Sequence, residues 1–275
     1  MDLDAYLRRI GHAGERSPTA DVLRAIAHRH AMAIPFENVT VLTQGAPDLQ
    51  LTALEDKLVL RRRGGYCYEQ NSLLGAMLAA MGFTVHAHSA RVRYGVAPDV
   101  VTPRSHMVLR VELPDGPMLV DAGFGSLTLT APVAMRRHEE QSTSHETVRF
   151  GAAQDDYLLQ ARVSGAWVDL YRFDLSPQLP IDFVQQNWHT ATRPGALFAN
   201  NLIVARPTAQ GRRMLVNRTL TRKTASGARE REFIADESQL QQTLRACFDL
   251  ELTPAELRAV WDLSGRSPGP GAVFD

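Results

Sequence analysis

Residues 63–71 read Arg63-Gly64-Gly65-Tyr66-Cys67-Tyr68-Glu69-Gln70-Asn71, a glycine turn followed directly by the start of an apolar helical run. Cys67 is one of only two cysteines in the chain. At the first turn of a helix, unpaired backbone N–H groups and the positive end of the helix dipole favour a negative charge. The segment therefore predicts a Cys67 thiolate that acts as a nucleophile, and a base for it is expected elsewhere in the chain.

The overall composition is that of an ordinary globular protein. The chain has 275 residues, of which 44% are hydrophobic and 22% charged, which predicts one large fold or two to three smaller lobes. Its formal net charge of +0 argues against a nucleic-acid partner, because such proteins usually carry a basic excess. The acidic start Met1-Asp2-Leu3-Asp4 lacks the features of a signal peptide, and no apolar stretch reaches the length of a membrane span. We therefore expect a cytoplasmic protein without a membrane partner.

Helical patterns dominate the first third of the chain, and strand patterns follow. Helices are expected from the cap Ser17-Pro18 to Ile34, from the capping box Thr52-Ala53-Leu54-Glu55 to Leu60, and from Cys67 to Gly82. Strands are expected at 83–94, 105–113, 118–121, 157–163, 167–173, 202–205, 214–224 and 230–234. Many short strands in series predict an antiparallel sheet or barrel.

The C-terminal part mixes both patterns. Residues 191–200 are expected to form the loop that leads into it. An amphipathic helix is expected at 237–248, and the capping box Thr253-Pro254-Ala255-Glu256 opens another helix through Trp261. The Gly- and Pro-rich tail from Ser264 is expected to be irregular.

His106 is the histidine best placed to serve Cys67 as a base. It opens the strand at 105–113, and the return strand at 118–121 ends in Asp121. Side chains alternate faces along a strand, so a connecting loop of two or four residues puts His106 and Asp121 on one face, whereas a three-residue loop without a bulge separates them. The pair predicts either a catalytic imidazole oriented by a carboxylate or a buried contact that only stabilises the fold.

The remaining histidines carry weaker signals. His28 and His30 lie on the second expected helix and are interpreted as surface or helix-end residues. His86 and His88 share one face of a strand, but no nearby cysteine or carboxylate completes a zinc site. We therefore expect no metal.

Four segments together resemble one known family. They are Ile34-Pro35-Phe36-Glu37-Asn38, the segment from Arg63 to Asn71, Ser105-His106-Met107, and Val120-Asp121-Ala122-Gly123-Phe124-Gly125. In this order and spacing they are similar to the motifs of bacterial-type arylamine N-acetyltransferases. The resemblance implies an α+β fold with an N-terminal helical bundle (1–82), a central antiparallel β-barrel (83–190), and a linker plus α/β lid (191–275). It also implies that the first two lobes are arranged as in cysteine proteases.

The same resemblance implies a chemistry. A Cys67-His106-Asp121 triad would pass an acetyl group from acetyl-CoA, through an acetyl-cysteine, to the nitrogen or oxygen of arylamines, arylhydrazines or arylhydroxylamines. Acetyl-CoA would act as a co-substrate, with no permanently bound cofactor, and the protein would be a monomer or homodimer. An amide synthase, a cysteine amidase or a transglutaminase-like enzyme would use the same triad. A binding module that keeps the fold without the chemistry is a further alternative.

The resemblance also implies binding residues. Acceptor contacts are expected from Phe36, Tyr68, Phe124, Ser126 and Phe198. Gly123 and Gly125 would let the coenzyme pyrophosphate approach the backbone. Core packing for the aromatic residues and turn geometry for the glycines are the alternative interpretations.

Overall fold

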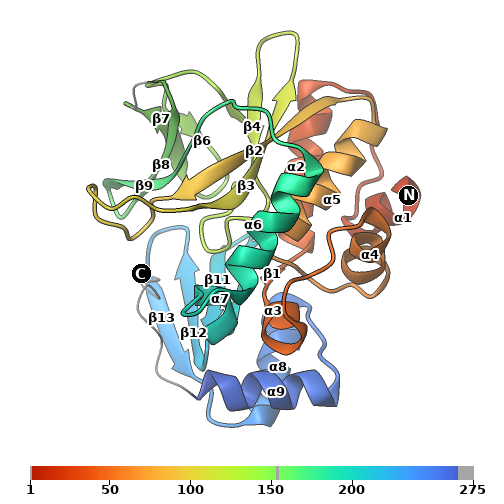
Figure 1. The fold of residues 1–275 in the computed structure, drawn as a ribbon, viewed down its shortest axis with the longest axis vertical. Coiled ribbons are helices and arrows are strands. Elements are labelled where there is room, and N and C mark those ends of the chain that lie inside the picture. The colour runs from red at the N-terminus through yellow and green to blue at the C-terminus, as the bar shows by residue number, and fades with distance from the viewer. Residues whose placement is uncertain (1, 153–154, 266–275) are drawn as a thin grey trace.

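The N-terminal part of the chain is helical, as its patterns predict. The structure is a computed structural model that describes residues 2–152 and 155–265 (Figure 1). The helices of this part are α1 (Leu3–Arg9), α2 (Ala20–Ala33), α3 (Val39–Gln44), α4 (Leu51–Leu54), the π-helical turn η1 (Glu55–Leu60) and α5 (Cys67–Ala80).

Two predicted helix starts are wrong. Helix α2 is capped by Thr19 and not by Ser17, because the Thr19 hydroxyl accepts a hydrogen bond from the backbone of Val22 at 3.4 Å. Helix α4 begins one residue before Thr52 and has no side-chain cap. The expected capping box is absent because the Glu55 carboxylate accepts instead from the backbone of Asp2 at 2.6 Å.

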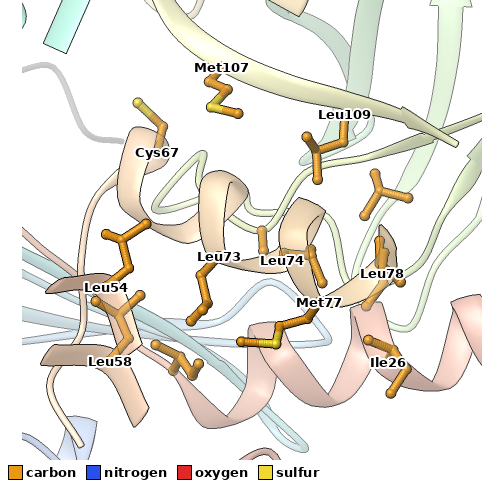
Figure 2. Packing of buried hydrophobic residues seen from close by; sticks show 14 of the residues in the cluster. Ile26, Leu54, Leu58, Cys67, Leu73, Leu74, Met77, Leu78, Met107 and Leu109 are labelled. Atoms are coloured by element: carbon orange, nitrogen blue, oxygen red, sulfur yellow. The ribbon is translucent and has the colours of Figure 1, made fainter. Parts of the chain in front are cut away.

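Helix α5 is the central element of the helical part and begins at Cys67, as predicted. Leu73, Leu74, Met77 and Leu78 are fully buried. Figure 2 shows leucines from α4 and η1 on one side of α5, and residues from strand β3 (Arg104–Glu112) on the other. Because α5 is buried from Cys67 to Leu78 along most of its length, Cys67 is held on a rigid support.

An eight-stranded antiparallel sheet curls into a nearly closed barrel. Its strands, in sheet order, are β5 (Val133–Ala134), β4 (Met118–Val120), β3, β2 (Thr84–Val92), β9 (Ala166–Phe173), β8 (Tyr157–Val163), β7 (Thr147–Gly151) and β6 (Gln141–Ser142). The Gln141 side chain joins the two edge strands, because its amide accepts from the backbone N–H of Ala134 at 2.7 Å and donates to the Ala134 carbonyl at 2.8 Å.

Of the two loop lengths that the sequence left open, the register between β3 and β4 is that of the two-residue loop. Leu109 lies opposite Val120, and Val111 lies opposite Met118. Continued along the strands, this register puts His106 opposite Gly123. His106 and Asp121 therefore share a face, as the alternation of side chains requires.

A second, five-stranded sheet forms the C-terminal part. Its order is β1 (Phe36–Glu37), β10 (Ile203–Thr208), β11 (Gly211–Val216), β12 (Thr219–Thr224) and β13 (Arg229–Phe233), and it is accompanied by α8 (Glu237–Phe248) and α9 (Pro254–Ser264). The single strand predicted at 214–224 is in fact a hairpin that turns at Asn217, whose φ is 53°. The expected cap of α9 at Thr253 is present. Ser264, where the irregular tail was predicted to begin, is the last residue of α9, and the tail from 266 onward lies outside the described residues.

Helix α6 (Pro180–Thr192) was not predicted and runs across the front of the molecule in Figure 1. The expected loop at 191–200 also contains the short helix α7 (Leu197–Asn200). The predicted boundary between residues 190 and 191 consequently falls inside α6. Two signals mark this helix: Pro180 at its first position, and Asp182, whose carboxylate accepts from the backbone of Leu179 at 2.7 Å.

His30 lies in the last turn of α2, as one of its two interpretations has it, but it is fully buried, so the other interpretation, a surface residue, is wrong. Its ring lies between the Tyr6 hydroxyl at 2.8 Å and the Gln70 amide oxygen at 2.7 Å. Burial lowers its pKa from 6.5 to about 4, although Gln70 opposes the shift. The native protein therefore holds a neutral imidazole where the unfolded chain takes up a proton.

This burial predicts an acid-sensitive fold. Between pH 6.5 and about 4 the unfolded state binds one more proton at His30 than the native state, so stability falls as the pH falls through this interval. We expect a loss on the order of 3 kcal/mol from this group. Urea unfolding at several pH values measures the loss, and His30→Gln should flatten it. Exposed His189→Gln is the control; an undiminished slope in His30→Gln would contradict the prediction.

Candidate active site

Cys67 is the first residue of α5 and lies almost buried, with its Sγ 3.9 Å from the carbonyl oxygen of Ser105. The preceding glycine turn is required by close packing. A Cβ atom at Gly64 would lie 2.2 Å from the carbonyl oxygen of Pro35, and one at Gly65 would lie 2.8 Å from the Cβ of Glu69. The two glycines thus let the chain enter the helix close beside the start of β1.

His106 and Asp121 form the contact that strand parity predicts. His106 Nε2 lies 2.8 Å from Asp121 Oδ2, and both side chains are buried. Because Nε2 is occupied by the carboxylate, Nδ1 is the ring nitrogen left for Cys67. Cys67 is the first residue of α5, His106 lies near the start of β3, and Asp121 directly follows β4.

The electrostatics of the pair favour a charged imidazole. Burial lowers the pKa of His106, but the Asp121 carboxylate and, to a smaller extent, Cys67 raise it to about 10. Burial likewise raises the pKa of Asp121, yet His106, Asn71 and the backbone of Gly123 together bring it below its usual value. At neutral pH the site therefore contains an imidazolium beside an ionised carboxylate.

Asn71 anchors the carboxylate, a role that the sequence analysis missed. Its Nδ2 donates to Asp121 Oδ1 at 2.9 Å and to the Met107 carbonyl at 2.7 Å, and its Oδ1 accepts from the backbone of Ala122 at 3.0 Å. Asn71 follows Cys67 by four residues and so lies on the same face of α5. That spacing is the signal that identifies it.

Gly123 is a point of close backbone approach. A Cβ atom there would lie 2.5 Å from the Cα of Cys67, so only glycine lets the loop after β4 come this near to α5. Gly125 has a φ of 80°, which favours glycine for a different reason. Packing and backbone geometry account for both residues, and their contact with coenzyme phosphates stays a prediction.

Tyr171 lies behind the histidine and was also missed. Its ring centroid is 4.9 Å from that of His106 and 5.2 Å from that of Phe124. Burial and the nearby Asp121 carboxylate raise the pKa of the Tyr171 hydroxyl well above its usual value. The hydroxyl is buried and forms no hydrogen bond with the described residues. Tyr171 thus packs against the imidazole of His106.

A cavity of about 270 Å³ opens beside Cys67 and His106. Predicted residues that line it are Phe36, Cys67, His106, Gly123, Phe124, Ser126 and Phe198. Lining residues that the sequence analysis missed include Tyr94, Thr102, Thr190, Arg193 and Leu197. Two aromatic side chains of the cavity wall pack against each other, with the ring centroids of Phe36 and Phe198 5.8 Å apart.

Tyr68 and Gly125 are predicted binding residues that do not line this cavity. The Tyr68 side chain is fully buried, its ring packs against Tyr66 and Phe183, and its hydroxyl lies 3.3 Å from the hydroxyl of Thr190. One position along a helix turns a side chain by about 100°, which carries Tyr68 away from the face of Cys67. Its role in the site is to support α6, which contributes to the cavity wall.

Within 2–152 and 155–265, no group of three or more His, Cys, Asp or Glu side chains is placed to hold a metal ion. Over the same ranges, none of the helices combines the length and apolar character that crossing a membrane demands.

Comparison with known proteins gives consistent matches over nearly the whole chain. The model of a family described as N-acetyltransferase matches residues 19–257. An arylamine N-acetyltransferase of Mycolicibacterium smegmatis is 41% identical over 97% of this chain and 95% of its own. That of Mycobacterium tuberculosis is 38% identical over 99% of both chains. The solved structure of the Mycobacterium marinum arylamine N-acetyltransferase in complex with CoA superposes with a TM-score of 0.91 at 35% identity, covering 95% of this chain and 99% of that one.

Proposed function

The chain belongs to the arylamine N-acetyltransferase family of acetyl-CoA-dependent acyltransferases, and from that premise we propose that its acetyl group travels through Cys67. The acceptors proposed are the nitrogen of arylamines and arylhydrazines and the oxygen of arylhydroxylamines. The observation that carries the proposal is the placement of Cys67 and His106 on one cavity, with Asp121 2.8 Å behind the imidazole.

The first half-reaction forms the acetyl-enzyme. The Cys67 thiolate attacks the thioester carbonyl of acetyl-CoA, a new C–S bond forms, and the bond to the coenzyme sulfur breaks. The His106 imidazolium gives its proton to the departing coenzyme thiolate. The backbone N–H of Cys67 at the start of α5 is the proposed donor to the negative oxygen of the intermediate.

The second half-reaction returns the enzyme to its starting state. The acceptor nitrogen attacks the acetyl-cysteine, the C–N bond forms, and the Cys67 thiolate leaves. His106, now neutral, takes the proton from the attacking amine. Asp121 orients the ring and stabilises its charged form in both halves, because its Oδ2 accepts a hydrogen bond from the Nε2–H of His106.

The cavity supports flat acceptors. Phe36, Phe124 and Phe198 form apolar walls, and the volume of about 270 Å³ lies just below the roughly 300–1,000 Å³ typical of ligand pockets. We assign Ser126 to the acceptor wall as well. Gly123 and Gly125 remain the proposed approach for the coenzyme, whose complex with the Mycobacterium marinum relative has been solved.

We also propose the lobe layout implied by the motifs. A helical lobe (1–82) would meet a barrel lobe (83–190) as in cysteine proteases, with 191–275 as linker and lid. In support, the buried apolar side chains form three clusters, centred on α5, on the barrel, and on the second sheet with α8 and α9. A monomer or homodimer in the cytoplasm, where thiols stay reduced, suits Cys67 as a nucleophile.

An assay of thiol release tests the proposed reaction. The protein is incubated with acetyl-CoA and an arylhydrazine while free coenzyme A is followed with a thiol reagent. Continued release of coenzyme A should require the acceptor. Double-reciprocal plots of initial rate against acetyl-CoA concentration, at several acceptor concentrations, should be parallel, as for a ping-pong reaction. Sustained release without any acceptor would indicate a hydrolase instead. No release above a Cys67→Ala control would contradict acetyl transfer altogether.

A further inference from the structure

A second cavity, of about 670 Å³, lies between α6, the middle of α5 and the strands β2 and β3. Among the described residues, none lines both this cavity and the one beside Cys67. Met107 lines the second cavity and its neighbour His106 the first, because successive side chains of β3 point to opposite faces of the strand. The second cavity is therefore a separate site behind β3, and its volume lies within the roughly 300–1,000 Å³ typical of ligand pockets.

Hydrogen bonds hold the walls of the second cavity in place. Asn187 of α6 donates through Nδ2 to the carbonyl of Pro47 at 2.9 Å, and both residues line the cavity. Asn71, on the α5 wall, is held by its bonds to Asp121 and to the Met107 carbonyl. The cavity is thus largely formed before a ligand arrives, which lowers the entropic cost of binding.

The lining of the second cavity is mostly apolar. Apolar side chains come from α5 and the strands on one side and from α6 on the other, among them Ala76, Val85, Leu109, Phe183, Val184 and Trp188. Val184 is 44% exposed and Trp188 63% exposed, although large apolar side chains are usually buried. Such a surface favours a ligand with an apolar body.

Asp48 supplies the charge of the second cavity. Of the described residues in the lining, it is the one with a charged side chain, and none is a lysine, arginine or histidine. Its Oδ1 accepts from the backbone of Gln50 at 2.8 Å, and within 2–152 and 155–265 no cationic side chain pairs with it. An unpaired carboxylate and the face of an exposed tryptophan such as Trp188 both attract an ammonium group.

We propose that the second cavity binds small molecules in which an ammonium group is attached to an aromatic or aliphatic body. The apolar body lies against α5 and β3, and the ammonium group points towards Asp48. Binding at this cavity does not depend on acetyl transfer, so it is measured without acetyl-CoA, and its failure leaves the proposed function untouched. A second copy of the chain is the alternative occupant of the apolar surface around Trp188, and the experiment separates the two.

The experiment measures Kd by calorimetry for three probes that share one phenylbutyl body: 4-phenylbutylamine, 4-phenylbutanol and 4-phenylbutyrate. At neutral pH they present an ammonium, a neutral hydroxyl and a carboxylate. We expect the amine to bind about three- to tenfold more tightly than the alcohol, as suits an ion pair with an exposed carboxylate, and the butyrate to bind most weakly. Alkylation of Cys67 by iodoacetamide, which narrows the other cavity, should leave the Kd of the amine unchanged.

Two pairs of variants locate the site. Asp48→Asn should remove the preference for the amine over the alcohol, whereas Asp262→Asn, at an exposed aspartate of α9, should keep it, because a distant charge is screened by salt. Ala76→Phe should fill the cavity and weaken the binding of all three probes about tenfold or more. Ala80→Phe, at an exposed position of α5 outside the lining, should leave binding unchanged. Thermal melts verify that each variant is folded.

Three results would overturn the proposal. Equal affinity for the amine and the alcohol, or a preference that persists in Asp48→Asn, would show that Asp48 does not recognise the ammonium group. A Kd that weakens on alkylation of Cys67 would place the amine in the other cavity. No saturable binding of the amine up to about 10 mM would leave the cavity without this ligand class. If sedimentation velocity then shows a dimer that Trp188→Asp dissociates, the apolar surface belongs to a second copy of the chain instead.

Discussion

Cys67→Ala is expected to lower acetyl transfer by about four orders of magnitude or more, because the covalent route loses its nucleophile. The substitution removes one sulfur atom from a small, nearly buried side chain at the start of α5, so the fold should persist. The initial rate of coenzyme A release measures the effect, and far-UV circular dichroism with a thermal melt verifies folding.

The chain provides a matched control for this substitution. Cys247 lies in α8, is also buried, and packs in the apolar cluster of the second sheet. Cys247→Ala should retain acetyl transfer and cost only stability, about 1 kcal/mol, as small core truncations do. Retained activity in folded Cys67→Ala would contradict a covalent route, and loss of activity in folded Cys247→Ala would contradict the assignment of the nucleophile.

Asp121→Asn is expected to lower kcat/KM by about 10²–10⁴-fold. The carboxylate accepts at both oxygens, from Asn71 and Gly123 at Oδ1 and from His106 at Oδ2. An amide has only one oxygen, so its NH₂ group must face one of these donors. Losing the negative charge also removes the main cause of the raised pKa of His106, so the imidazole should become neutral at a lower pH than about 10.

The rate at which iodoacetamide alkylates Cys67, measured as a function of pH, separates the loss of a hydrogen-bond acceptor from the loss of the negative charge. In Asp121→Asn the change in alkylation rate that reports deprotonation of His106 should move to a lower pH than in the wild type. Asp169→Asn is the control, since Asp169 accepts a hydrogen bond from Gln160 at 2.8 Å in the barrel and does not line the cavity. If Asp121→Asn folds and keeps the activity of Asp169→Asn, then Asp121 has only a structural role.

Local rules predict the helix start at Cys67 and the pairing of His106 with Asp121. Both follow from short-range geometry: a glycine turn before an apolar run, and the alternation of side chains across a tight hairpin. The resemblance of the motifs then identified the family, which the comparisons confirm. The helix start and the pairing can be predicted because few contacts between residues distant in the sequence are needed to specify them.

Other features depend on contacts that a sequence does not display. Glu55 resembles a capping residue but binds the backbone of Asp2, 53 positions away. His30 has the spacing of the buried face of α2, but a histidine is usually exposed; it is buried because Tyr6 of α1 and Gln70 of α5 bind its ring. Tyr171 reaches His106 only because β9 pairs with β2, which pairs with β3. Helix α6, by contrast, carried visible capping signals that were not used.

The central claim is that the acetyl group rests on Cys67 between the two substrates. Intact-mass spectrometry of the wild-type protein after acetyl-CoA alone tests it most directly, with peptide mapping to locate the adduct. The mechanism predicts one acetyl group on the peptide that contains Cys67, lost when an arylamine is added and absent in Cys67→Ala. An unmodified protein that still acetylates arylamines when both substrates are present would contradict it.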